Sequence, residues 1–148
     1  MGSSDAIVGN VVKLTGTAYL ESDAGRVPLK VGSTVSEGAV IVTGEHSNVQ
    51  LRMADDSYIS QGENSHLELD EFSYDPDDAD GSGLFVSLAK GAFRMITGFI
   101  ARQNPDHVRF KTPTAVCGVR GTDFWVIVDE NGEQIGVIDI TDHHVLVV

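Results

Sequence analysis

Residues 110–124 read Phe110-Lys111-Thr112-Pro113-Thr114-Ala115-Val116-Cys117-Gly118-Val119-Arg120-Gly121-Thr122-Asp123-Phe124. The segment is apolar and β-prone, yet Arg120 stands in it between two glycines. Burying an unpaired guanidinium is costly, so we expect Arg120 to bind backbone carbonyls or a carboxylate such as Asp123. Gly118 and Gly121 allow the backbone to pass close by or to adopt positive φ. We interpret Arg120 and Asp123 as a structural pair that pins one part of the core to the next, with ligand recognition as the alternative.

The same stretch resembles the signature of the FecR domain family, which reads roughly T-P-T-A-x-x-G-x-R-G-T-x-F. The residues that carry this structural motif are Thr112, Pro113, Thr114, Gly118, Arg120, Gly121, Thr122, Asp123 and Phe124. Further blocks of the family pattern follow upstream in the expected order: Gly16-Thr17-Ala18, Leu29-Lys30-Val31-Gly32, Val40-Ile41-Val42-Thr43-Gly44, Leu51-Arg52-Met53-Ala54-Asp55-Asp56-Ser57 and Lys90-Gly91-Ala92-Phe93-Arg94. The resemblance covers residues 11–148, where we expect a FecR-like β domain, and leaves residues 1–10 as an N-terminal extension.

The resemblance implies a non-enzymatic protein-interaction or signalling module. Members with an understood role resemble periplasmic sensor segments, which relay a signal between an outer-membrane receptor and a cytoplasmic sigma-factor regulator. A periplasmic or cell-surface location and a protein partner in the cell envelope are therefore implied. The sequence has no apolar run that would span a bilayer and no amphipathic helical head, so we expect no direct membrane insertion. Residues 1–5 lack the basic and apolar regions of a signal peptide, so the location rests on the resemblance.

Composition limits the fold and the classes of partner. A chain of 148 residues with 41% hydrophobic content suits one domain with its own core. A net charge of −12 argues against binding to nucleic acid or anionic lipid, because both require a basic surface. The single cysteine, Cys117, cannot form an internal disulfide, and we expect it to be a small buried hydrophobic residue.

Short apolar or alternating segments, separated by glycines at spacings near ten, predict an all-β fold. The predicted strands cover residues 7–14, 17–22, 26–29, 40–42, 47–53, 57–60, 66–72, 84–88, 92–97, 107–111, 123–128, 134–140 and 143–148. Two architectures remain open, a solenoid-like coil and a flattened sandwich of many short strands, of which we favour the coil. At most one short helix is expected, over residues 98–104, and Pro105 would end it.

Alternation and turn residues predict which side chains face the core. Val49, Leu51 and Met53 should point to one side of their strand. In residues 66–72 two leucines follow the same alternation, which is interrupted before the final phenylalanine. Residues 129–132 contain Asn-Gly, a strong hairpin signal, and residues 23–25 are expected to form a similar turn.

Acidic residues gather in the longest polar stretch, residues 74–83, which we expect to be a mobile surface loop. Oxygen-bearing residues at alternate positions followed by glycine resemble the opening of an EF-hand loop, but Ala89 occupies the position of the bidentate glutamate. A weak calcium site remains possible from four residues, Asp75, Asp77, Asp78 and Asp80. Otherwise no cofactor is expected. The alternative function is accordingly a calcium-dependent structural module of a surface or adhesin-like assembly.

No arrangement of nucleophile, base and acid has the spacing of a known catalytic motif, so we expect no enzymatic activity. The adjacent His143 and His144 face opposite ways on an extended strand and cannot both bind one zinc ion without a turn.

Three residues are candidates for protein contacts. Trp125 follows Phe124 on a predicted strand, so one ring should be buried and the other should face outward, where it could anchor a partner. Val145 and Val147 lie in an apolar terminal strand that could pair with a neighbouring subunit, so a homodimer is possible. We therefore expect contacts to be made through an exposed strand edge or an exposed aromatic patch.

Overall fold

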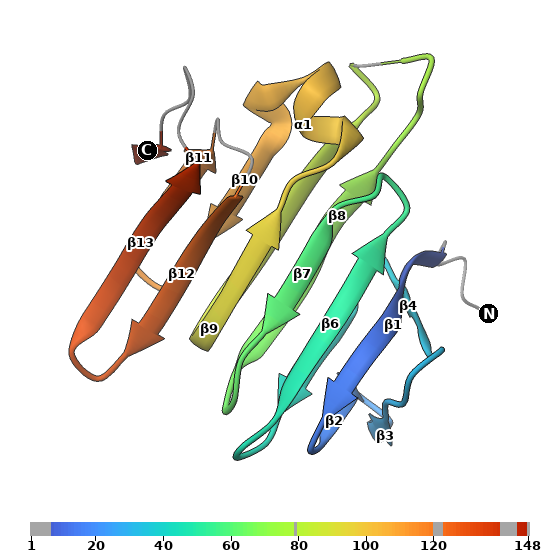
Figure 1. Ribbon diagram of the computed structural model, residues 1–148, viewed down its shortest axis with the longest axis vertical. Coiled ribbons are helices and arrows are strands. Elements are labelled where there is room, and N and C mark those ends of the chain that lie inside the picture. The colour runs from blue at the N-terminus through green and yellow to red at the C-terminus, as the bar shows by residue number, and fades with distance from the viewer. Residues whose placement is uncertain (1–6, 79, 120–122, 140–144, 148) are drawn as a thin grey trace.

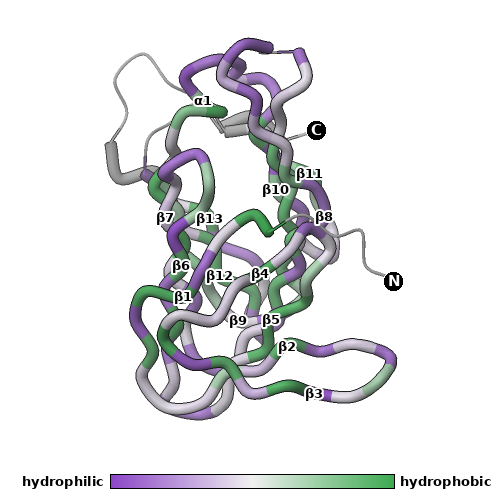
Figure 2. The backbone as a smooth tube through the Cα atoms, turned by 90° about the vertical axis from the view of Figure 1, so that its right-hand side faces the viewer, coloured by the Kyte–Doolittle hydropathy of each residue, from purple (hydrophilic) through white to green (hydrophobic). Residues whose placement is uncertain are grey.

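The computed structural model describes residues 7–78, 80–119, 123–139 and 145–147. It is an all-β fold with one short α-helix, as expected. Two sheets face each other as the layers of a sandwich, which is most easily seen from the side (Figure 2). The flattened sandwich is therefore the better of the two expected descriptions, although the chain winds through it progressively.

The first sheet, sheet A, faces the viewer in Figure 1. Its strands, in spatial order, are β4 (Thr34–Ser36), β1 (Ile7–Thr15), β6 (Asn48–Met53), β7 (Tyr58–Gln61), the second half of β9 (Gly83–Ile96), β12 (Asp123–Asp129) and β13 (Gly132–Asp139). Sheet B lies behind it. Its strands, in spatial order, are β3 (Gly25–Pro28), β2 (Ala18–Ser22), β5 (Val40–Thr43), β8 (His66–Ser73), the first half of β9, β10 (Val108–Lys111), β11 (Val116–Val119) and β14 (Val145–Val147).

The strand β9 belongs to both sheets. Its first half pairs with β8 and β10 in sheet B, and its second half pairs with β7 and β12 in sheet A. Gly91, with φ of 94°, stands where the strand crosses between the layers. A side chain is disfavoured at such a φ, which explains the glycine.

Two corner turns with nearly the same sequence carry the chain between the layers. Residues 44–47 read Gly-Glu-His-Ser and connect β5 in sheet B to β6 in sheet A. Residues 62–65 read Gly-Glu-Asn-Ser and connect β7 in sheet A to β8 in sheet B. The third residue of each turn, His46 or Asn64, adopts positive φ. This repeat was not recognised in the sequence, and it accounts for the coil-like winding.

The serine that ends each corner bonds to a neighbouring segment. Ser47 Oγ accepts a hydrogen bond from the N–H of Thr17 at 2.9 Å, and Ser65 Oγ accepts one from the N–H of Ala92, also at 2.9 Å. Each donor residue, Thr17 or Ala92, directly follows a positive-φ glycine, Gly16 or Gly91. The two corners also contact each other, because the N–H of Asn64 donates to the carbonyl of Gly44 at 3.0 Å, so they stack at one end of the sandwich.

Alternation correctly predicted the core-facing residues. Val49, Leu51 and Met53 are buried, and β8 is irregular between Glu68 and Glu71, where the pattern slips. The predicted hairpins at residues 23–25 and 129–132 are both present. The helix α1 (Phe99–Gln103) was also expected, whereas the 3-10 helix η1 (Pro105–His107) that follows it was not.

Three expectations need correction. The short strands β4 and β11 were not predicted. The segments 84–88 and 92–97, expected as two strands, form one continuous strand, β9. Residues 7–10 were assigned to an N-terminal extension, but they begin β1, where Val8 is buried and Gly9 pairs with Met53. The folded domain therefore starts at least as early as Ile7.

Candidate interaction surface at the β13 edge

The signature stretch supplies two aromatic rings to the core. Phe110 on β10 and Phe124 on β12 come from opposite sheets, and their rings stack at a centroid distance of 5.4 Å. Phe93 on β9 meets both rings edge to face, at 6.1 and 5.9 Å. All three are buried. Burial of such a cluster ties the two ends of the signature to the shared strand.

The T-P-T-A part of the signature forms the turn between β10 and β11. The N–H of Thr112 donates to the carbonyl of Ala115 at 2.8 Å, and the N–H of Ala115 donates back to Thr112 Oγ1 at 3.2 Å. Pro113 occupies the second position of this turn and is exposed. Thr114 Oγ1 donates to Glu133 Oε2 on β13 at 2.5 Å. The signature turn therefore contacts the last strand of sheet A.

Asp123 forms its ion pair with a residue that the sequence did not single out. Arg94 on β9 donates from Nε and Nη2 to the two carboxylate oxygens of Asp123, at 2.9 and 2.6 Å. Such a bidentate pair is among the stronger charged contacts. Arg120, Gly121 and Thr122 lie outside the described residues, so the structural role of Arg120 stays a prediction.

Phe124 and Trp125 lie on opposite faces of sheet A. Phe124 is buried in the core, and Trp125 is half-buried on the outer face. Trp125 pairs in register with Gly136 of β13, and a Cβ placed on Gly136 would approach the indole to 2.2 Å. The indole therefore lies directly over the backbone of β13, in space that only glycine leaves open.

The strand β13 forms one edge of sheet A. Over its eight residues it pairs with β12, and no other described strand pairs with it. Glu133 and Ile135 are half-buried on the inner side, opposite Val128 and Val126, whereas Gln134 is exposed on the outer side. Figure 1 shows β13 at the left margin of the sheet, next to β12. An edge of this kind presents backbone donors and acceptors to another chain.

The terminal strand β14 pairs within the chain. Val145 and Val147 were expected to meet a neighbouring subunit, but β14 pairs antiparallel with β11 in sheet B through Val119 and Cys117. This pairing uses one side of β14, and pairing of its other side with a neighbouring subunit stays a prediction.

The acidic stretch is an exposed loop, as expected, whose carboxylates bond to its own backbone. Asp75 Oδ1 accepts from the N–H of Asp77 at 2.9 Å, and Asp78 Oδ1 accepts from the N–H of Gly81 at 3.2 Å. Gln103 of α1 donates to the carbonyls of residues 75 and 76. Asp80, the remaining member of the expected calcium set, is exposed. Within the described ranges, no three His, Cys, Asp or Glu side chains gather into a group that could hold a metal ion.

Cys117 is buried in β11, as expected, and burial raises the pKa of its thiol. A buried thiol with a raised pKa is a poor nucleophile. His143 and His144 lie outside the described residues.

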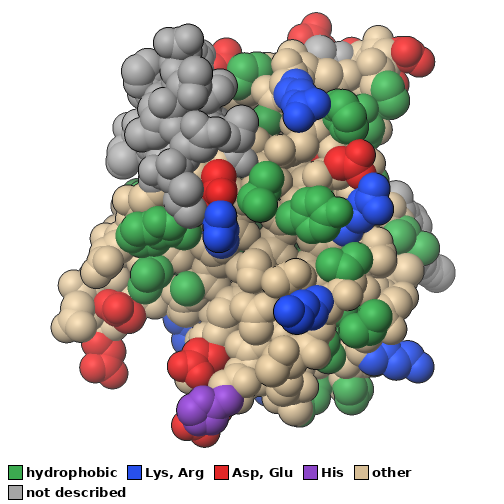
Figure 3. All heavy atoms as spheres, viewed as in Figure 1, with side chains coloured by type: hydrophobic (Ala, Val, Ile, Leu, Met, Phe, Trp, Pro, Cys, Tyr) green, Lys and Arg blue, Asp and Glu red, His purple; other side chains and the backbone are tan. Residues whose placement is uncertain are grey.

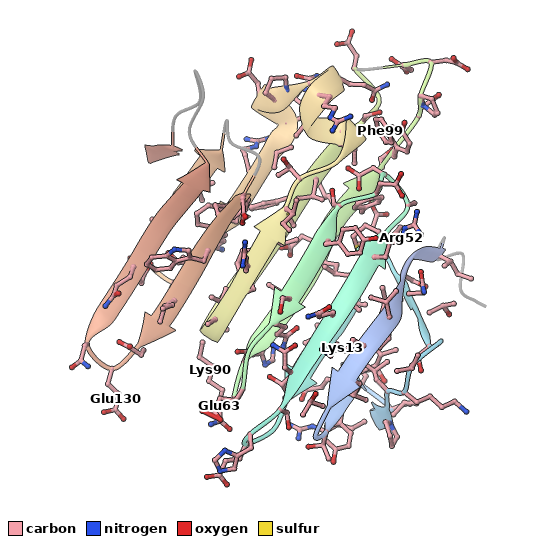
Figure 4. All side chains as sticks on the ribbon, in the orientation of Figure 1. Lys13, Arg52, Glu63, Lys90, Phe99 and Glu130 are labelled. Carbon is pink, nitrogen blue, oxygen red and sulfur yellow. The ribbon has the colours of Figure 1, made fainter. Side chains whose placement is uncertain are left out.

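The outer face of sheet A carries basic and apolar side chains side by side (Figure 3). Tyr58 and Ile96 are cross-strand neighbours with 42% and 43% exposure. With Arg94 they border a shallow hollow of about 240 Å³. Arg52, labelled in Figure 4 on the same face, binds Asp56 at 2.8 Å. The bases of this face are thus partly neutralised by neighbouring acids.

Sequence reasoning missed three residues of the β13 region: Arg94, Glu133 and Gly136. An isolated glycine within a predicted strand signals close approach of another group, so Gly136 carried a readable signal. Arg94 ends one of the blocks of the family pattern, but nothing local revealed its pairing or that of Glu133, because their partners are distant in sequence.

Comparison with known families identifies the chain. A family model described as FecR protein matches residues 39–139. The chain belongs to the FecR protein family. This confirms the expected resemblance, and the matched segment includes both repeated corners, the signature turn and the whole of β13.

Other comparisons are sparser. One solved structure, described as a cell surface anchoring domain, is 26% identical, with a TM-score of 0.40 over 43% of this chain and 84% of that chain. Comparison with curated proteins gives no match. Within the described ranges, none of the helices has both the length and the apolar character required to cross a membrane.

Proposed function

We propose that this FecR-family domain is a non-enzymatic, envelope-associated module that binds an extended segment of another polypeptide along β13. The observation that carries the proposal is the outer side of this eight-residue strand, with which no strand of the described ranges pairs. Strand addition to a sheet edge supplies affinity through main-chain hydrogen bonds and specificity through alternate side chains.

The edge strands of the two sheets differ in length and composition, and both properties favour β13 as the binding edge. Counted over the residues that the structure describes, the other three edge strands are short: β4 and β14 have three residues each, and β3 has four. Short edges, lysines and prolines are devices that prevent unwanted pairing. The sequence of β13, Gly-Glu-Gln-Ile-Gly-Val-Ile-Asp, contains neither lysine nor proline. The longest edge is thus also unprotected by either residue type.

Side chains near the edge would have to contribute to binding. A stable interface buries at least about 1,000 Å² in total, more than one added strand provides through its backbone. Trp125 lies over the backbone of β13 and offers a large side chain on the outer face. We place the domain in the periplasm or at the cell surface, where FecR-type sensing would put its protein partner.

Site-specific photo-crosslinking in the native cell envelope tests the proposal. A photoreactive residue at Gln134, exposed on β13, should give an adduct with another polypeptide. The matched control is Val27, which is 59% exposed on the distant edge strand β3 and should give none. Adducts of equal yield from both positions would contradict binding at β13.

Proline substitutions at Gln134 and Ile135 provide the second arm. Consecutive N–H groups of a strand point to opposite sides, so one variant removes an outward donor and the other disturbs pairing with β12. Both variants carry the photoreactive residue at Ile127, the cross-strand neighbour of Gln134 on the outer face. The variant that keeps the melting temperature should lose the adduct formed from that position. Sedimentation across a concentration series then distinguishes a foreign partner from a second copy of the chain.

A further inference from the structure

We infer that the β13 edge selects a partner segment that carries a basic residue three positions away from an aromatic or large apolar residue. This inference rests on the proposed function and specifies the chemistry of the partner. Two residues of β13 support it: a strand added beside them would meet an anionic side chain at Glu133 and an apolar surface at Gly136.

Glu133 supplies an anionic contact on the inner side of β13. Its carboxylate is held by the hydroxyl of Thr114, and hydrogen bonds from Thr112 and Thr114 lower the pKa of Glu133. The side chain is therefore charged and already oriented at neutral pH. A residue directly opposite on an added strand would lie at about 5 Å between Cβ atoms, where an opposite charge is favourable. A lysine or arginine at that position would form an ion pair with the carboxylate of Glu133.

Gly136 supplies an apolar contact on the outer side. Because Trp125 covers this glycine, the indole lies toward the open edge of the sheet instead of standing upright on β12. A side chain next to Gly136 on an added strand would find no Cβ opposite and would meet the indole. Aromatic and large apolar side chains gain most from such a contact.

The spacing of the two contacts follows from strand geometry. Residues 133 and 136 are three apart and therefore face opposite sides of the sheet. Their partners on an added strand are also three apart and face opposite sides, whether the strand runs parallel or antiparallel. The recognised pattern is thus a base and an apolar residue separated by two positions.

Charge complementarity selects a foreign segment over a second copy of this chain. Three acidic residues lie in or beside the turn that leads into β13: Asp129, Glu130 and Glu133. Glu130 extends from that turn in Figure 4. The whole chain has a net charge of −12, so pairing of two β13 edges would bring like charges together. A basic segment of another protein meets no such repulsion.

A peptide-display selection against this protein tests the pattern. The library contains random peptides long enough to cover the eight residues of β13. We expect enrichment of sequences with lysine or arginine three positions from an aromatic or large apolar residue. Trp125 is the only tryptophan of the chain, so its fluorescence reports binding of a tryptophan-free peptide. Glu133→Lys should weaken an enriched peptide about tenfold and favour its charge-reversed version.

Matched variants keep the outcomes distinct. Gln134→Lys introduces a lysine on the outer side of the same strand and should leave the lysine preference unchanged. Glu133→Gln changes the charge by one unit, as Gln134→Lys does, and should remove the preference without inverting it. Enriched peptides that bind β13 but respond equally to both lysine variants would overturn this inference and leave the proposed function intact. Enriched peptides that bind the folded proline variants of β13 as well as the original protein would overturn both.

Discussion

At the residue scale, Asp55 shows how a buried carboxylate can fasten a helix to a sheet. It is fully buried in the turn between β6 and β7. Its Oδ1 accepts from the N–H of Ser57 at 3.0 Å, and its Oδ2 accepts from the N–H of Ile100 in α1 at 3.1 Å. Gly98 precedes the helix and leaves no room for a Cβ, which would lie 2.1 Å from the carbonyl oxygen of Asp55. The block Leu51–Ser57, noted for its family resemblance, is therefore the anchor of α1.

We expect Asp55→Asn to lower the free energy of unfolding by about 2 kcal/mol, because one buried N–H loses its acceptor and faces an amide donor. Urea melts measure the change. Asp56→Asn is the control, since Asp56 is exposed and has a φ of 66°, which asparagine tolerates. A loss at Asp55 no larger than that at Asp56 would contradict the anchoring role.

Glu68 predicts a pH-dependent stability. Partial burial, together with the neighbouring charge of Asp70 and a hydrogen bond to it, raises the pKa of Glu68 above 4.5. The folded state therefore holds this proton more tightly than the unfolded state does. The corresponding stability is fully present below the unfolded pKa and is lost as pH rises through the raised folded pKa. Glu68→Gln should raise the urea midpoint at pH 7 and leave it unchanged below about pH 4. An equal effect at both pH values would indicate a cause other than ionisation.

At the scale of elements, the repeated corners carry a matched pair of predictions. Ser65→Ala should leave the N–H of Ala92 without its acceptor, and Ser47→Ala should do the same to Thr17. Each substitution should cost about 1–2 kcal/mol of unfolding free energy. Ser60→Ala on the outer face of β7 is the control. Similar losses at the two corners would support their equivalence, whereas a loss at one alone would show that only one corner is structural.

The acidic loop carries the calcium prediction, which the structure leaves untested. The backbone N–H groups of the loop already occupy one carboxylate oxygen each of Asp75 and Asp78. We expect the melting temperature in millimolar calcium to equal that in a chelator, because a bound ion would stabilise the fold by mass action. A rise of several degrees with calcium, absent with magnesium, would revive the calcium-dependent alternative.

Strands were predictable from the sequence wherever alternation was long enough to define a buried face. The pattern in β6 was unambiguous, whereas β4 has only three residues and β11 contains Gly118. The opposite orientations of Phe124 and Trp125 followed from the period of a strand. The Arg94–Asp123 ion pair could not be predicted in this way. It joins residues 29 positions apart, and local patterns do not encode the order of strands that brings them together.

At the scale of the whole molecule, β9 is the structural centre. Because it pairs on both sides along most of its length and joins the two layers, its backbone N–H groups should exchange with solvent most slowly. Hydrogen exchange followed by mass spectrometry would test this order, with β3 and β4 expected to exchange fastest. Slow exchange throughout β13 would contradict an open edge there.

The progressive strand order also determines how the domain would respond to tension. In both sheets the strands near the N-terminus and those near the C-terminus lie at opposite margins, with β9 between them (Figure 1). A pull on the two margins would act across the strands, along the hydrogen bonds that join neighbours. Such loading separates one strand pair after another instead of shearing many bonds at once. Tethered between two anchored structures, the domain would yield stepwise from its margins and would keep the pairs around β9 until last.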